Sequence, residues 1–338
     1  MQQFIPLELF GYFLVFQSHF SKPNFIYFQG YIWGLLLARG RKTMNNIAHS
    51  CFWVERSLSS WERFLSENLW DVNAVGKTLV TLLLQKLGKK LQVHGGYLAG
   101  LDTLLVPKNG QKMSGVQLWK DHSGNADRGE RLKGHHWGIL GLIGWEETGQ
   151  RYWCWPLKMR LISGKLNPFQ FIIAPHGVAR RADFWDGVVP LLLDLKQQLG
   201  SVVLRVVVDA YFCKVPFLQP LTSVGIHVIT RMRKDVVAWD QRIESERKKS
   251  VKMAGEWKLA HLLRDFTPQQ LSVKIYGKSV QLEVVERKVF IRGFQPQVKV
   301  VVAKGSKEPI IFLSSDLTLS AIQIIEIYAA RFSIELAI

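Results

Sequence analysis

Cysteine is scarce in this chain of 338 residues. Its three cysteines, Cys51, Cys154 and Cys213, lie far apart in the sequence. No two of them form a C-x-x-C motif, so the sequence indicates neither a zinc knuckle nor the framework of a disulfide-stabilised secreted domain. A reducing compartment suits such a chain, and we expect it to work in the cytoplasm.

Long apolar runs are lacking as well. The charge-free stretch "PNFIYFQGYIWGLLLA" (23–38) is shorter than the ~20 residues that a membrane-spanning helix needs. It opens with Pro23 and contains two glycines, and no signal-peptide pattern precedes it. We therefore predict a buried helix here and no membrane partner.

Acidic residues are few relative to basic ones. Asp and Glu number 27 against 44 Lys and Arg, which gives a net charge of +17. This excess favours a polyanionic partner, with nucleic acid ahead of an anionic membrane surface, although an ordinary basic protein is the plainer alternative. Hydrophobic residues make up 48% of the chain, which is enough for a packed core and argues against disorder.

The spacing of apolar residues changes along the chain. From 24 to about 92 they recur every three or four residues, which predicts helices, with Thr43 as an N-cap after a basic turn. From 93 onward the pattern predicts three strands and then a helix that ends at Gly200. A strand over 202–209, a short helix or turn over 215–225 and a strand over 226–233 follow.

Three sequential antiparallel strands followed by helix-linked parallel strands are typical of a ribonuclease-H-like mixed α/β sheet. Beyond this core the sequence predicts strand after strand and then a final helix with a Ser320/Gln323 capping box. We divide the chain into a helical domain (1–92), the first part of the core (93–240), a β-rich insertion (241–316) and the terminal helix of the core (317–338).

Two aspartates are candidates for chemistry. Asp102 lies inside the strand-like "YLAGLDTLLVP", and Asp209 ends "VVLRVVVD". If these strands are neighbours, both carboxylates reach one sheet edge, where the pair is costly unless a cation such as Mg²⁺ binds between them. The alternative is two unrelated strand-end aspartates that cap a helix or turn. Asp121 and Asp127, in the polar stretch "DHSGNADRG", are second choices for the first carboxylate.

The terminal helix carries a third carboxylate. Tyr328, Arg331 and Glu335 lie at i, i+3 and i+7, within roughly 60° of arc. Ile324, Ile327 and Ile334 share this side, whereas Gln323, Glu326 and Ser333 mark the side that we expect to face solvent. A Glu and an Arg on a largely buried face need partners, and a local Arg331–Glu335 ion pair is the plainer alternative.

This spacing, after a β-rich stretch, resembles the Y-R-E-K signature of bacterial insertion-sequence transposases of the DDE superfamily. The segment "LDTLLVPKNGQKMSGV" (101–116) is similar to the family's first-aspartate segment. The segment "VVVDAYFCKVPFLQPLTSVGIHVITRMRKD" (206–235) is similar to its second-aspartate segment. The resemblance covers nearly the whole chain, starting from "YFQGYIWGLLLARGRKT" (27–43).

The resemblance implies a catalytic and metal-binding triad of Asp102, Asp209 and Glu335. It implies two Mg²⁺ ions, with Mn²⁺ as a possible substitute, and phosphate contacts from Tyr328 and Arg331. The implied activity is cleavage at the ends of a mobile element and strand transfer into target DNA. The implied partners are double-stranded DNA, both terminal inverted repeats and target, and a second copy in a synaptic homodimer. The expected place is the bacterial cytoplasm, at the nucleoid.

Other residues suit contact with DNA. We expect the helical domain to bind DNA, and we expect Trp239 to stack on a flipped base, with core packing as its alternative. The candidates for a phosphate track are Arg39, Arg41, Lys42, Arg231, Arg233 and Lys234.

The family's signature lysine would stand seven residues after Glu335, four positions beyond Ile338. We therefore expect a sequence that is truncated within the terminal helix. The alternative function is an inactive remnant that only binds DNA.

Overall fold

The computed structural model divides the chain into two compact units, with the division between Lys86 and Leu87. Asp121 and Asp127, the second choices for the first carboxylate, lie outside the residues that the structure describes. The described residues are 7–110, 113–120, 131–162, 171–173, 179–181, 184–245 and 250–337.

The N-terminal unit is helical, as its apolar spacing predicts. Thr43 caps α3 as expected, because its hydroxyl oxygen accepts a hydrogen bond from the Asn46 amide at 3.3 Å. Its helices are α1 (Leu7–Leu14), α2 (Lys22–Leu37), α3 (Met44–Ser50), α4 (Leu58–Ser66) and α5 (Val72–Leu87), the last of which runs to the division. Among the described residues no helix is both long and apolar enough to cross a membrane.

Two glycines let α2 pack closely against its neighbours. A Cβ on Gly30 would lie 2.6 Å from the ring of Trp61. A Cβ on Gly34 would lie 2.5 Å from the Ile47 side chain and 2.8 Å from the Ile47 carbonyl oxygen. Because a backbone oxygen cannot move as a side chain can, α2 and α3 can approach this closely only if position 34 is glycine.

We predict that Gly34→Ala destabilises the N-terminal unit by about 1–3 kcal/mol, since overpacking outweighs the gain in helix propensity. Gly76→Ala in α5 is the matched control, because a Cβ there meets nothing within 4 Å. The control should be stabilised by up to about 1 kcal/mol. Thermal unfolding of both variants measures the difference, and equal stabilisation of the two would contradict the packing argument.

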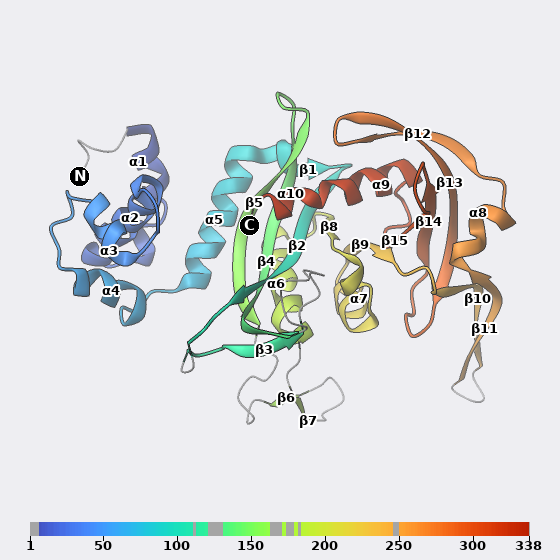
Figure 1. Cartoon of the computed structure of the whole chain (residues 1–338), viewed down its shortest axis with the longest axis horizontal. Coiled ribbons are helices and arrows are strands. Elements are labelled where there is room, and N and C mark those ends of the chain that lie inside the picture. The colour runs from blue at the N-terminus through green and yellow to red at the C-terminus, as the bar shows by residue number, and fades with distance from the viewer. Residues whose placement is uncertain are drawn as a thin grey trace. The chain divides into compact units, whose positions relative to one another are not determined.

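The C-terminal unit is built on one mixed sheet with helices on both faces. The sheet order is β11-β10-β13-β14-β15-β9-β8-β2-β4-β3, with β1, β5 and β12 pairing beside β2, β4 and β13 (Figure 1). Its first strands are β1 (Gln92–Val93), β2 (Gly96–Pro107), β3 (Gln117–Lys120), β4 (Arg131–Glu146), β5 (Arg151–Ile162), β8 (Leu204–Val207) and β9 (Ile226–Met232). The later strands are β10 (Val237–Ser245), β11 (Ser250–Lys258), β12 (Gln269–Ile275), β13 (Lys278–Ile291), β14 (Val298–Lys304) and β15 (Ile310–Ser314). A separate small pair consists of β6 (Phe171–Ile173) and β7 (Ala179–Arg181).

The pairing pattern confirms the ribonuclease-H-like core. The three strands β2, β4 and β5 pair antiparallel in sequence order, and β8 then pairs parallel with both β2 and β9. The helices of this unit are α6 (Phe184–Leu199), α7 (Val215–Thr222), α8 (Leu262–Asp265), α9 (Ala321–Ala330) and α10 (Phe332–Glu335).

Glycines on neighbouring strands show which helix covers which face. A Cβ on Gly138 of β4 would lie 3.1 Å from Val188 of α6. A Cβ on Gly100 of β2 would lie 3.3 Å from Ile334 of α10. Gly138 pairs with Thr103, which faces opposite to Gly100 on β2, so α6 and α10 lie on opposite faces of the sheet.

The predicted β-rich stretch continues the core sheet. Its last strand, β15, pairs antiparallel with β9 over Ile311↔Met232 to Ser314↔Ile229. Pairing then runs outward through β14 and β13 to β10 and β11. The sheet is thus unbroken from the strand that carries Asp102 to the strands that precede the terminal helix.

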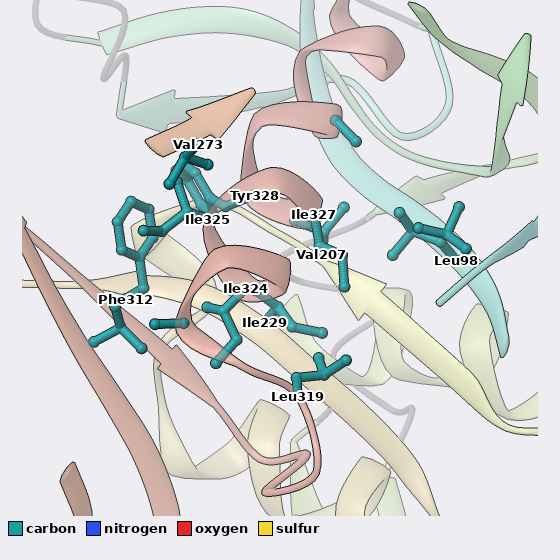
Figure 2. Close-up of a cluster of buried hydrophobic side chains, with 14 of the residues drawn as sticks. Leu98, Val207, Ile229, Val273, Phe312, Leu319, Ile324, Ile325, Ile327 and Tyr328 are labelled. Atoms are coloured by element: carbon teal, nitrogen blue, oxygen red, sulfur yellow. The ribbon is translucent and has the colours of Figure 1, made fainter. Parts of the chain in front are cut away.

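The terminal helix packs on the sheet through an apolar face. Ile324 and Ile327 of α9 point toward Val207 and Ile229 on the parallel strands (Figure 2). Tyr328 packs against Phe312 of β15, with ring centroids 5.1 Å apart. This packing fixes α9 over the strand ends where the acidic residues lie.

Candidate active site

Asp102 and Asp209 lie in the same register on neighbouring parallel strands. The last paired residues of β2 and β8 are Gly100 and Val207, and each aspartate follows two residues later. Because side chains alternate along a strand, Asp102 is on the same face as Gly100, and Asp209 is on the same face as Val207. This is the face that α9 and α10 cover. Adjacent strands are about 4.8 Å apart, so both carboxylates stand at one edge of the sheet.

Backbone amides hold one oxygen of each carboxylate. The Thr103 amide donates to Oδ1 of Asp102 at 2.7 Å, and the Tyr211 amide donates to Oδ1 of Asp209 at 3.0 Å. Asp209 thereby caps a short 3-10 helix (Ala210–Phe212), so the plainer capping role is present. These amides do not bind Oδ2 of either side chain, which can therefore take a further partner.

Arg331 joins the terminal helix to this edge. Its Nη1 donates to Oδ2 of Asp102 at 3.4 Å, and its Nη2 lies 2.7 Å from Oε1 of Glu335. The local Arg331–Glu335 pair is therefore present, and the same guanidinium also reaches across to Asp102. The Arg331 side chain is only 9% exposed. The Arg331 guanidinium also lies 4.8 Å from the ring centroid of Phe332 and 5.8 Å from that of Tyr328.

The helix tightens at Arg331, which separates α9 from α10. The Arg331 amide donates to Tyr328 and the Ile334 amide to Arg331, both three residues back, and the Ser333 hydroxyl donates to Ala330. A tighter turn rotates each later residue further around the axis.

Two expected orientations are therefore corrected. Ser333, expected to face solvent, is 7% exposed, whereas the side chain of Glu335, expected on the buried side, is 42% exposed.

Burial raises the pKa of both aspartates. For Asp102, desolvation outweighs the Thr103 hydrogen bond and the Arg331 charge, and the nearby Asp209 and Glu335 charges raise its pKa further. Desolvation likewise raises the pKa of Asp209 against the Tyr211 hydrogen bond and Arg331, with a further raising effect from Glu335. Burial opposes the charge of Arg331, but Tyr328, Glu335 and Asp102 outweigh it and raise its pKa. Negative charge at this edge is thus only partly compensated.

A family comparison bears on this arrangement. The family model described as "DDE superfamily endonuclease" matches residues 16–258, which is more than half of the chain. This chain belongs to the DDE superfamily of endonucleases. The matched residues include Asp102 and Asp209 and end before the terminal helix, so Glu335 is outside the match. No curated protein matches the chain significantly.

The donors at this edge suit a divalent cation. Endonucleases of the DDE superfamily typically use divalent metals, and carboxylate oxygens are the ligands that Mg²⁺ prefers. Oδ2 of Asp209 has no side-chain hydrogen-bond partner among the contacts described, and both aspartates have raised pKa values that an added cation would relieve.

Within the described residues, however, no three His, Cys, Asp or Glu side chains form a group that could hold a metal. The three carboxylates that we expected to share an ion do not form one cluster. Asp102 and Glu335 each pair with the Arg331 guanidinium instead.

Arg231 is a phosphate-track candidate whose charge acts on a residue of the terminal helix beside the site. It is exposed at the end of β9, beside the strand that leads to Asp209, and its charge acts to lower the pKa of Tyr328, which burial raises. Arg233 pairs with Asp235 at 2.9 Å, and Lys234 pairs with Glu308 at 2.8 Å. Both pairs are exposed, so they are weak and leave the side chains available to a phosphate.

The remaining candidates lie elsewhere. Trp239 is half-buried on β10, which five strand spacings, about 24 Å along the sheet, separate from β8. Arg39, Arg41 and Lys42 are exposed in the loop between α2 and α3 of the N-terminal unit. The side-chain amide of Asn46 donates to the carbonyls of Arg39 and Arg41 and orders this loop.

Sequence reasoning missed one residue beside the site. Tyr276 stands at the tip of the β12–β13 hairpin, is 64% exposed, and contacts Phe332 with ring centroids 5.6 Å apart. Its φ of +49° and the +76° of Gly277 fit the two-residue turn that joins Ile275 to Lys278. The Tyr-Gly pair between two strand patterns signals the turn, but no local signal places it against α10.

We predict that Asp102→Asn stabilises the metal-free protein at neutral pH. Because the native pKa of Asp102 is raised, its contribution to stability is full below the unfolded pKa and is lost as the pH rises through the native pKa. In chelator at pH 7 the variant should melt above the parent, and the difference should shrink toward pH 4.

The matched control is Asp194→Asn on α6, whose carboxylate pairs with Lys158 away from the site. It should not melt higher than the parent protein. A lower melting temperature for Asp102→Asn at pH 7 would show that Arg331 already compensates the carboxylate.

Proposed function

We propose that this DDE endonuclease is a DNA transposase of the Y-R-E-K branch, which cleaves DNA at the ends of an insertion sequence and joins them to target DNA. The carrying observation is the Arg331 guanidinium, which bridges Glu335 of the terminal helix and Asp102 of the sheet, beside Asp209. The signature residues of the helix therefore meet the strand-borne aspartates of the family match at one edge.

The chain's own residues supply recognition of the scissile phosphate. Arg331 contacts the acidic edge, and the charge of the exposed Arg231 acts on Tyr328 of the terminal helix. A guanidinium can bind a phosphate with two parallel hydrogen bonds. Because both terminal nitrogens of Arg331 now contact carboxylates, binding of phosphate requires this side chain to exchange partners. The Arg331 guanidinium lies over the Tyr328 ring, and we propose that both side chains contact the same phosphate.

Asp102 and Asp209 would hold Mg²⁺ or Mn²⁺, which lowers the pKa of a bound water and stabilises the leaving 3′ oxygen. The aspartates lie on a rigid part of the sheet, since β8 is paired on both sides and all four of its residues are buried. A site of this kind keeps its oxygens in place while DNA binds and leaves. Glu335, which now pairs with Arg331, would be available as a third ligand if Arg331 bound the phosphate instead.

Charge favours nucleic acid as the partner. The chain carries +17, and exposed basic side chains occur both on the helical unit and beside the acidic edge. Such a surface attracts duplex DNA without reading its sequence. We therefore propose that the helical unit contributes to holding the element ends.

We predict that the purified chain nicks a plasmid bearing the DNA that flanks its gene on both sides, in Mg²⁺ or Mn²⁺ and not in chelator. Asp102→Ala and Asp209→Ala should each lower the nicking rate by more than about 100-fold, because a lost ligand costs more than a lost outer-shell partner. DNA affinity in gel-shift titrations should stay close to that of the parent.

Asp235→Ala is the control, since this exposed carboxylate pairs only with Arg233 among the contacts described. It should nick at the parental rate. DNA binding without metal-dependent nicking by the parent chain would favour the alternative function, a remnant that only binds DNA. Nicking retained by both alanine variants would remove Asp102 and Asp209 from the site.

A further inference from the structure

We propose that Arg205 is a positioning residue that sets the terminal helix against the two aspartates, an inference that rests on the proposed function. Its guanidinium is buried, with the side chain 7% exposed, and its Nε donates to Oδ2 of Asp316 at 2.8 Å. Its Nη1 donates to the carbonyls of Val93 and His94 at 3.2 and 3.1 Å. This side chain of β8 thus binds two other segments, so three segments meet at Arg205.

Each of these segments leads to a residue of the acidic site. Arg205 itself stands on β8, four residues before Asp209 and on the same face of the strand. Val93 ends β1 and His94 begins the turn into β2, which carries Asp102. Asp316 lies in the loop that leads into α9, and through it to Arg331 and Glu335.

The fit around Arg205 is close. A Cβ on Gly96, the first residue of β2, would lie 2.8 Å from Nη1 of Arg205. Glycine at this position therefore lets the guanidinium reach the carbonyls of the preceding turn. The hydrogen bonds and the glycine together fix where β2 begins relative to β8.

The loop around Asp316, which Arg205 contacts, is ordered by further hydrogen bonds. The second oxygen of Asp316 accepts hydrogen bonds from the Thr318 amide at 3.0 Å and the Thr318 hydroxyl at 2.6 Å. The Val228 amide donates to the Ser315 hydroxyl at 2.8 Å, which ties the loop to β9. The Arg205–Asp316 contact therefore acts on the start of α9 and not on a loose segment.

Position matters more at the far end of the helix than at its start. The fifteen residues from Ala321 to Glu335 span about 22 Å, so a tilt of about 5° at the start moves the end by about 2 Å. A displacement of about 1 Å at a reacting centre can cost a hundredfold in rate. A buried ion pair adds little stability over apolar replacements of similar size, so positioning is the effect that such replacements would reveal.

The test is the double variant Arg205→Met/Asp316→Leu in the full chain, compared with Arg287→Met/Asp240→Leu. The control removes another Arg–Asp pair, 3.1 Å apart, which joins β13 to β10 and neither of the strands that carry the aspartates. In the plasmid-nicking assay, kcat of the first variant should fall about 100-fold, with KM for DNA within about threefold of the parent. The control should keep both constants.

A distance measurement gives a readout that needs no catalysis. Nitroxide labels at Val224→Cys and Leu336→Cys, both exposed, report α10 against the core in a Cys213→Ser background, where the other thiols are buried. The test variant should shift or broaden the distance distribution by about 2 Å. The control variant should leave the distribution unchanged.

An unchanged distribution together with an unchanged kcat in the test variant would overturn the proposal. A shifted distribution in a protein whose parent does not nick DNA would support positioning and refute the proposed function. If the double variant does not fold, Asp316→Asn, which removes only the charge, takes its place in both measurements, and the same outcomes support or overturn the proposal.

Discussion

The cost of holding negative charge at a poorly hydrated sheet edge governs this molecule. Two parallel strands in register bring Asp102 and Asp209 to one place, and the terminal helix adds Glu335. A carboxylate that loses its water needs a cation or several hydrogen bonds in exchange. In this chain the Arg331 guanidinium forms ion pairs with two of the three carboxylates, Asp102 and Glu335. A backbone amide donates a hydrogen bond to each aspartate.

A fourth carboxylate on the same face shows what full compensation looks like. Burial opposes the charge of Asp316, yet the Thr318 hydrogen bonds, Arg205 and the nearby His227 outweigh it and lower its pKa. The pKa values of Asp102 and Asp209 are raised instead. The unit thus holds two kinds of buried carboxylate. The charge of Asp316 is compensated by hydrogen bonds and nearby cations, whereas the charges of Asp102 and Asp209 are only partly compensated. Such a shortfall is what a site for a cation and a phosphate requires.

Much of the fold could be predicted from local signals. Gly200, with a φ of +62°, closes α6, and the Ser320/Gln323 capping box opens α9, because each depends only on neighbouring residues. The order of elements also predicted that Asp102 and Asp209 lie on neighbouring strands, since helix-linked parallel strands have few possible arrangements.

The rest depended on contacts that no short window contains. A uniform 100° step placed Ser333 outside and Glu335 inside, but the tighter turn at Arg331 exchanged them. The contact between Tyr276 and Phe332 joins a hairpin tip to a helix, and periodicity carries no information on such a meeting. Periodicity indicates which side of a helix is buried, but not the residue that it is buried against.

The separation of these parts along the chain has a consequence for assembly. Arg331 and Asp102 are 229 residues apart, so their contact closes a long stretch of chain and carries an entropic cost. Until α9 docks, Asp102 and Asp209 face one another without the Arg331 charge, and the phosphate-binding side chains of the helix are elsewhere. The two aspartates and this cation are therefore one site only when α9 is packed on the sheet. At the other end of the helix, the buried contact between Arg205 and Asp316 joins its leading loop to β8.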